Sequence, residues 1–181
     1  EKALVHLGQE AVITRDKDVI LASDKVILPG VGSFGDAMAK LREYGLVQVI
    51  YDVVEKKTPF LGICLGLQLL FESSEESEGV AGLGILPGKI IRIPDQEGLK
   101  IPHMGWNSIH VNENATLFKD IPQDPYVYFV HSYYLAAKHE EDVAATTFYS
   151  TNIHASVEHE NIFACQFHPE KSSNVGLKIL E

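Results

Sequence analysis

The sequence predicts an α/β fold with a mostly parallel central sheet flanked by helices and an antiparallel, β-rich second half. In the first half, short apolar runs alternate with helix-length stretches, and a parallel connection needs about a dozen residues to cross a sheet. From Gly88 onward the apolar runs become short, alternating or aromatic, which favours strands joined by hairpins. The two halves therefore differ in how their strands are expected to pair.

Spacing and turn residues define the elements expected in the first half. The expected elements are a helix near residues 3–7, strands over 11–14 and 25–28, a helix from 36 to about 55 with a break at Gly45, a strand over 59–63, and a helix over 65–71. The strand over 25–28 is apolar enough to be buried on both faces. Asp36 is the expected N-cap of the long helical segment.

The second half contains four apolar runs typical of strands. They cover residues 89–93, 126–130, 144–148 and 162–167, with a turn expected over 158–161. Residues 73–78 are rich in glutamate and are interpreted as a solvated acidic loop. We expect residues 1–181 to form a single domain that is trimmed at both ends, with an N-terminal strand absent from this chain.

Composition excludes several classes of function. Asp and Glu outnumber Lys and Arg by 25 to 15, and a net charge of −10 repels the phosphate backbone of nucleic acids. No apolar run approaches the roughly 18 residues of a membrane span. Cys64 and Cys165 lack the spacing of a zinc or redox pair, so we expect a reducing cytoplasm, no metal and no cofactor.

A nucleophile is expected at Cys64. The run Gly62-Ile63-Cys64-Leu65-Gly66 has the form of a nucleophile elbow, a sharp strand-to-helix turn that exposes one side chain at the edge of a sheet. Its glycines allow close backbone approach, and the N–H of Leu65 would point toward an oxyanion formed at Cys64. The motif alone favours the alternative that Cys64 is a small buried apolar residue. The strand before it and the helix after it make the two interpretations about equally well supported.

The segment Gln166-Phe167-His168-Pro169-Glu170 favours the catalytic interpretation. Alternation along the strand places Cys165 and His168 on opposite faces, so Cys165 is interpreted as a core residue. Pro169 ends the strand where His168 would overhang the sheet edge. Glu170 is close enough to hold one ring nitrogen of His168 while the other faces a thiol, which is the logic of a catalytic triad.

These motifs, with the glycine-rich loop over residues 29–35, resemble the triad-type class I glutamine amidotransferases. The stretches 102–107, 128–133 and 167–172 make the chain most similar to the glutaminase subunits of imidazole glycerol phosphate synthases. The resemblance implies hydrolysis of L-glutamine, with the ammonia passed to a cyclase subunit in a heterodimer of histidine biosynthesis. The residues it implies are Cys64, His168 and Glu170 for catalysis, Val31 and Leu65 for the oxyanion, Gln68, Ser132 and Tyr133 for the substrate, and Tyr128, Met104, Trp106, Asn107 and Lys171 for the partner face.

Other functions remain open at this point. A stand-alone γ-glutamyl hydrolase or cysteine peptidase would share Cys64 and His168 but would need an open groove. The chain could also serve another synthase, or be a non-enzymatic interaction module on the same fold. Gln68 could be a solvated helix residue, and Trp106 and Tyr128 could be core aromatic residues.

Overall fold

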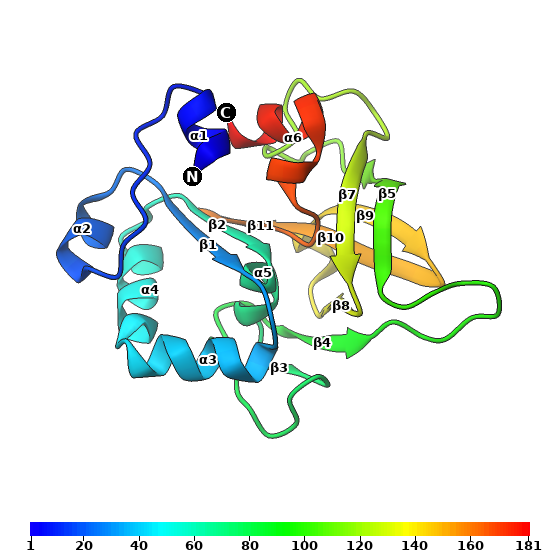
Figure 1. Cartoon of the computed structure of the whole chain (residues 1–181), viewed down its shortest axis with the longest axis horizontal. Coiled ribbons are helices and arrows are strands. Elements are labelled where there is room, and N and C mark those ends of the chain that lie inside the picture. The colour runs from blue at the N-terminus through cyan, green and yellow to red at the C-terminus, as the bar shows by residue number, and fades with distance from the viewer.

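The computed structural model describes residues 1–181 as an α/β fold built on a curled mixed sheet (Figure 1). The helices are α1 (Lys2–His6), α2 (Lys17–Ala22), α3 (Phe34–Glu43), α4 (Leu46–Glu55), α5 (Leu65–Leu69) and α6 (Ser173–Leu180), with 3-10 turns η1 (Glu140–Asp142) and η2 (Pro169–Lys171). The strands are β1 (Val26–Gly30), β2 (Phe60–Cys64), β3 (Ser73–Ser74), β4 (Gly88–Arg92), β5 (His103–Ser108), β6 (His110–Val111), β7 (Tyr126–His131), β8 (Tyr133–Ala137), β9 (Val143–Tyr149), β10 (Thr151–His159) and β11 (Ile162–Cys165). No helix is long and apolar enough to cross a membrane.

The large sheet has nine strands, with the path β1-β2-β11-β10-β8-β4-β3 and with β9 and β6 branching from β10. Strands β1, β2 and β11 run parallel to one another, whereas β10 pairs antiparallel with β11, β9 and β8. Strands β5 and β7 form a separate antiparallel ribbon. The predicted α/β class and the antiparallel second half are therefore confirmed.

Helices cover both faces of the parallel part of the sheet. On one face, α3, α4 and α5 bury residues such as Phe34, Ile50 and Leu67 in the larger apolar cluster. On the other face, Ile179 of α6 and Phe129 of the β5–β7 ribbon belong to a second cluster. The Cys64 end of β2 thus lies between two packed layers.

Two expectations for the strands of the first half are wrong. Residues 11–14 form no strand, and Val12 and Ile13 are 66% and 81% exposed, because no neighbouring strand pairs with them. The short helix α2 follows instead, with the Asp16 carboxylate accepting from two backbone N–H groups of its first turn. Strand β1 is only partly buried, not buried on both faces, because it stands at the edge of the sheet.

The acidic loop stabilises the start of α3 and is not merely solvated. The Glu76 carboxylate accepts from the N–H of Phe34 at 2.8 Å, and the Ser77 hydroxyl accepts from the N–H of Gly35 at 2.9 Å. Ser33, rather than the expected Asp36, is the N-cap, because its hydroxyl accepts from the N–H of Asp36. The end of the glycine-rich loop is therefore fixed by polar contacts.

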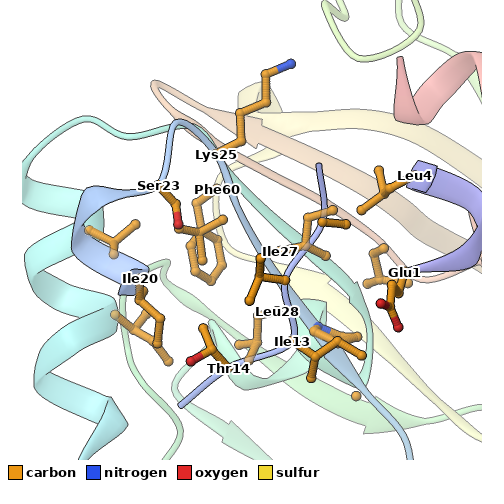
Figure 2. Close-up of a pocket in the computed structure, with 18 of the residues that line it drawn as sticks. Glu1, Leu4, Ile13, Thr14, Ile20, Ser23, Lys25, Ile27, Leu28 and Phe60 are labelled. Carbon is orange, nitrogen blue, oxygen red and sulfur yellow. The ribbon is translucent and has the colours of Figure 1, made fainter. Parts of the chain in front are cut away.

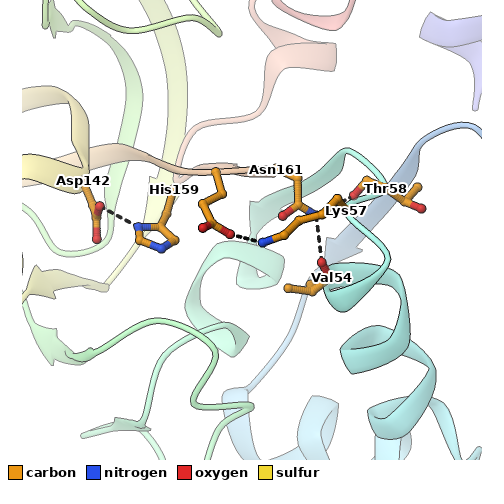
Figure 3. A network of polar contacts seen from close by, with 7 residues as sticks. Val54, Lys57, Thr58, Asp142, His159 and Asn161 are labelled. Atoms are coloured by element: carbon orange, nitrogen blue, oxygen red, sulfur yellow. Dashed lines mark hydrogen bonds and ion pairs between the residues drawn. The ribbon is translucent and has the colours of Figure 1, made fainter.

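The turn between β10 and β11 fastens the end of α4 to the sheet (Figure 3). The Asn161 amide donates to the carbonyl oxygens of Val54 at 3.2 Å and Thr58 at 2.8 Å. Beside it, Lys57 and Glu160 form an exposed ion pair. The turn expected over 158–161 is shorter in the structure: it consists of Glu160 and Asn161, with Glu160 at a φ of 53°, because β10 continues to His159.

A groove with a cavity volume of about 970 Å³ opens beside β1 (Figure 2). Most of its lining is apolar, including Leu4, Ile13 and Ile27. The ends of α1 and α6 contribute to it, and it reaches the side chains of His168 and Glu170. Cys64 does not line the groove.

Candidate active site

Cys64 occupies a strained turn between a strand and a helix. It is the last residue of β2 and the N-cap of α5, with φ 54° and ψ −110°. A positive φ at a residue with a Cβ atom is costly and is found where the surrounding structure enforces it. The conformation is that of a nucleophile elbow.

Two glycines make this turn possible. A Cβ atom at Gly66 would lie 1.8 Å from the carbonyl oxygen of Leu28, and one at Gly30 would lie 2.8 Å from Cβ of Leu65. The helix α5 therefore approaches β1 more closely than any side chain would permit. Gly30 and Cys64 are register partners, which places the glycine-rich loop at the same sheet edge as the thiol.

The other two residues of the predicted triad lie just beyond the neighbouring strand β11. The ring Nδ1 of His168 and Oε1 of Glu170 are 2.8 Å apart. The His168 side chain is buried, whereas the Glu170 side chain is 40% exposed. Because β11 pairs in parallel with β2, His168 and Cys64 lie at the same edge of the sheet.

The electrostatics of the site favour a protonated His168. Its interactions with Cys64 and with Glu170 raise the pKa of His168 to about 9, against the opposing effect of burial. Burial raises the pKa of Glu170, but the hydrogen bonds from His168 and the backbone, together with the charges of His168 and Lys171, outweigh it, and the pKa of Glu170 lies below its usual value. The pair is thus an imidazolium held by a carboxylate at neutral pH.

The backbone of His168 is tied to β7. The N–H of His168 donates to the carbonyl oxygen of Tyr128 at 2.9 Å. The buried hydroxyl of Ser172 donates to the carbonyl oxygen of His168 at 2.6 Å and accepts from the N–H of Tyr128 at 2.9 Å. No role was assigned to Ser172 from the sequence. Its position four residues after His168 is the only local feature of the sequence that indicates a contact between the two.

A second residue missed from the sequence lies next to the thiol. The Gln166 side chain is completely buried, and its Nε2 lies 3.6 Å from Cys64 Sγ. Its Oε1 accepts from Nε2 of Gln68 at 2.9 Å, and the same Gln68 nitrogen donates to the carbonyl oxygen of Tyr133 at 3.1 Å. Gln68 is therefore not a solvated helix residue. The sequence could have indicated this position, because the expected alternation places Gln166 on the same strand face as His168.

The other residues predicted for the oxyanion and substrate are also near this edge. Leu65, buried, opens α5 directly after the thiol. Val31 follows β1 with its side chain 84% exposed. The carbonyl oxygen of Ser132 accepts from Ile93 and that of Tyr133 from Gln68 and His131, so neither carbonyl is free.

The residues predicted for the partner face fall into two groups. Met104 and Trp106 are 61% and 53% exposed on β5, and Trp106 packs edge-to-face on Tyr128 of β7 with ring centroids 6.0 Å apart. Lys171 is exposed in η2. Asn107 instead turns to the other side of β5, where its amide donates to the carbonyl oxygen of Phe148 at 3.1 Å. Four of the five residues can therefore face a partner.

Cys165 lies in the core, completely buried. Burial, together with the nearby Cys64, raises the pKa of the Cys165 thiol well above its usual value. No group of three or more His, Cys, Asp or Glu side chains is arranged to hold a metal ion.

Comparison with known proteins agrees with this geometry. The family described as class-I glutamine amidotransferase matches residues 2–181. The chain is 50% identical to the imidazole glycerol phosphate synthase subunit HisH of Moorella thermoacetica, over 100% of this chain and 85% of that protein. It is 47% identical to the subunit of the same name from Methanocaldococcus jannaschii, over 98% of this chain and 88% of that protein.

Solved structures show the same fold. A crystal structure titled as a glutamine amidotransferase superposes with a TM-score of 0.74 at 22% identity, covering 97% of this chain and 86% of that one. The glutaminase domain of Trypanosoma brucei CTPS, solved with bound acivicin, gives a TM-score of 0.68 at 16% identity, covering 98% and 82%. The strand-to-helix elbow, the fold and the full-length family match together place this chain in the class I glutamine amidotransferase family.

Proposed function

We propose that this chain is the glutaminase subunit of an imidazole glycerol phosphate synthase. It hydrolyses glutamine to glutamate and ammonia, and the ammonia passes to a cyclase subunit that makes imidazole glycerol phosphate and AICAR in histidine biosynthesis. The observation that carries the proposal is the His168–Glu170 pair, which lies beside the Cys64 elbow at one sheet edge. The relatives named as this subunit, with 47–50% identity, support it.

In the proposed reaction, the Cys64 thiol gives its proton to His168, and Cys64 Sγ attacks the side-chain amide carbon of glutamine. The new S–C bond converts the amide oxygen into an oxyanion, which the N–H of Leu65 and, after a peptide flip, that of Val31 would stabilise. Gly32, with φ 90° and open space around its Cα, makes that flip sterically inexpensive.

His168 then gives its proton to the departing nitrogen. The C–N bond breaks, ammonia leaves and a γ-glutamyl thioester remains on Cys64. A water molecule gives a proton to His168 and adds to the thioester, the S–C bond breaks, and glutamate is released. Glu170 orients the ring throughout and stabilises its charged form.

Gln68 is suited to hold the amino-acid end of the substrate. Both polar contacts of its Nε2 are made within the protein, while its Oε1 accepts no hydrogen bond and is not sealed from solvent. An amide oxygen in that position can accept from an α-ammonium group. At Ser132 and Tyr133 a substrate carboxylate would accept from the backbone N–H groups, since a carbonyl oxygen is not a donor.

The partner face would consist of Met104, Trp106, Tyr128 and Lys171. Exposed aromatic and methionine side chains are enriched at protein interfaces, and aromatic anchors carry much of the binding energy. We expect Trp106→Ala to raise the Kd for the cyclase subunit roughly 30-fold, since such anchors contribute about 2 kcal/mol. Phe148→Ala, at an exposed aromatic residue outside the β5–β7 ribbon, is the matched control.

Ammonia release with and without the cyclase subunit tests the proposal. We expect glutaminase activity to rise strongly when the cyclase is added and to be lost in Cys64→Ser. Full activity without a partner would instead favour a stand-alone γ-glutamyl hydrolase. Undiminished glutaminase activity in Cys64→Ser would refute every mechanism that uses this thiol.

A further inference from the structure

A line of buried hydrogen bonds ends on the thiol. Gln68 Nε2 donates to the carbonyl oxygen of Tyr133, and this nitrogen also donates to Gln166 Oε1 at 2.9 Å. Gln166 Nε2 then lies 3.6 Å from Cys64 Sγ, within the range of an N–H···S hydrogen bond. Gln68 is 5% exposed and Gln166 is 0% exposed, so water does not compete for these contacts.

The orientation of both amides is fixed by the carbonyl of Tyr133. A carbonyl oxygen only accepts, so Gln68 must turn its NH2 group, rather than its oxygen, toward Tyr133. The nitrogen of Gln68 then meets Gln166, which must present its oxygen. The remaining end of Gln166 facing Cys64 is consequently its NH2 group, a donor.

Histidines on the far side hold the same carbonyl in place. His131 Nδ1 donates to the Tyr133 oxygen at 2.9 Å, and His103 Nδ1 donates to His131 Nε2 at 3.0 Å. Burial lowers the pKa of His131 to about 3, so its ring is neutral and its Nε2 is free to accept. His103 is stacked between Phe129 and Tyr149, which prevents its ring from turning.

We propose that Gln166 is a further catalytic residue, which donates a hydrogen bond to the Cys64 thiolate and holds its sulfur for attack. This inference rests on the proposed role of Cys64 as the nucleophile. A buried donor stabilises a thiolate more than solvent-exposed donors do, because the contact is less screened. Gln166 Nε2 contacts the sulfur, so loss of this donor alone affects kcat rather than KM.

Two substitutions separate the donor from the volume of the side chain. Gln166→Met keeps the length but removes both the N–H group and the oxygen that accepts from Gln68, whereas Gln166→Glu keeps the shape and an acceptor but places a carboxylate against the sulfur. We expect kcat for glutamine hydrolysis by the complex with the cyclase to fall roughly 10-fold in the first and 100-fold in the second, with KM changed less than about threefold in Gln166→Glu. The pH midpoint for alkylation of Cys64 by iodoacetamide should rise in the same order.

Ser156→Ala is the matched control. The Ser156 hydroxyl is also completely buried and donates to the carbonyl oxygen of Ala164 at 2.7 Å on the adjoining strands, without any link to the thiol. Its loss should lower stability and leave the alkylation midpoint of Cys64 unchanged. Mass mapping distinguishes Cys64 from Cys165 in each sample.

If neither variant folds, NMR of the unsubstituted chain still tests the proposal. The side-chain amide protons of Gln166 in the 15N-labelled protein should shift when Cys64 is titrated and should change again when it is alkylated. An unchanged alkylation midpoint in both variants, or amide protons that ignore the thiol, would overturn the role of Gln166. A Cys64→Ser protein that retains glutaminase activity would overturn the proposed function instead.

Discussion

At the scale of single residues, His168 is the group whose charge most directly limits the proposed reaction. It must hold a proton to release ammonia, and its contacts with Cys64 and Glu170 keep its pKa near 9. Activity that depends on the imidazolium is present at neutral pH and is lost as the pH rises through about 9. The alkaline side of the profile therefore reports on the triad.

Glu170→Gln should move this alkaline limb. Without the carboxylate, one of the two contacts that raise the pKa of His168 is lost, so kcat/KM should begin to fall at a lower pH than in the unsubstituted chain. We also expect a loss of at least about 10-fold at the optimum, because the ring is no longer held in its productive tautomer. A pH–rate profile of the complex measures both effects.

The control is Glu181→Gln, which removes an equal charge from an exposed pair with Lys178. Its profile should coincide with that of the unsubstituted chain. If Glu170→Gln kept the same alkaline limb, the carboxylate would not be acting on His168.

Sequence alone predicts positions for a triad but not the hydrogen-bond network around them. Cys64, His168 and Glu170 each lie in a local motif, an elbow or a strand end, whose geometry depends on a few neighbouring residues. Gln166 and Gln68 meet across 98 positions of the chain, and the carbonyl that orients them is 65 positions from Gln68. Such contacts arise from the tertiary fold, so propensity and spacing do not report them.

At the scale of elements, the first 25 residues show where local patterns fail. Val12 and Ile13 have β-branched side chains that favour a strand, but a strand also needs a paired neighbour, which they lack. The N-cap at Asp16 was a readable signal for α2, although only two turns of helix follow it. The longer elements α3, α4 and β2 were predicted closely because their periodic apolar residues pack in the core.

The connection between α4 and the β10–β11 turn depends on Asn161. Asn161→Asp replaces a donor that serves two carbonyl oxygens by a carboxylate that repels them, and we expect the free energy of unfolding to fall by about 2–4 kcal/mol. Urea denaturation followed by circular dichroism measures the change. Lys57→Ala, which removes the neighbouring exposed ion pair, should have little effect. Equal losses in the two variants would contradict the assigned role of the Asn161 amide.

At the scale of the whole molecule, the buried histidines link stability to pH. Burial lowers the pKa of His131 to about 3 and that of His103 to about 4. In the unfolded chain both rings take up protons near pH 6.5, so the unfolded state binds more protons between these values. Their contribution to stability is complete above about pH 6.5 and is lost as the pH falls.

We expect the free energy of unfolding to drop by roughly 3 kcal/mol between pH 6.5 and pH 4 on account of His131 alone. His131→Asn, which retains a donor for the Tyr133 carbonyl, should show a shallower decline over this range. Urea midpoints measured at several pH values provide the comparison. Parallel curves for the two proteins would show that His131 does not titrate on unfolding.

The backbone at Cys64 has a consequence for the stability of the entire domain. A residue with a Cβ atom at φ 54° and ψ −110° stores about 1–3 kcal/mol of strain, which the packing of both apolar clusters must offset. The backbone conformation that presents the Cys64 thiol therefore lowers the stability of the fold. Cys64→Gly should have a free energy of unfolding roughly 1 kcal/mol higher than that of Cys64→Ala, and therefore a higher urea midpoint. At most positions the glycine variant of a protein is the less stable of the two. The most durable form of this protein would then be an inactive one.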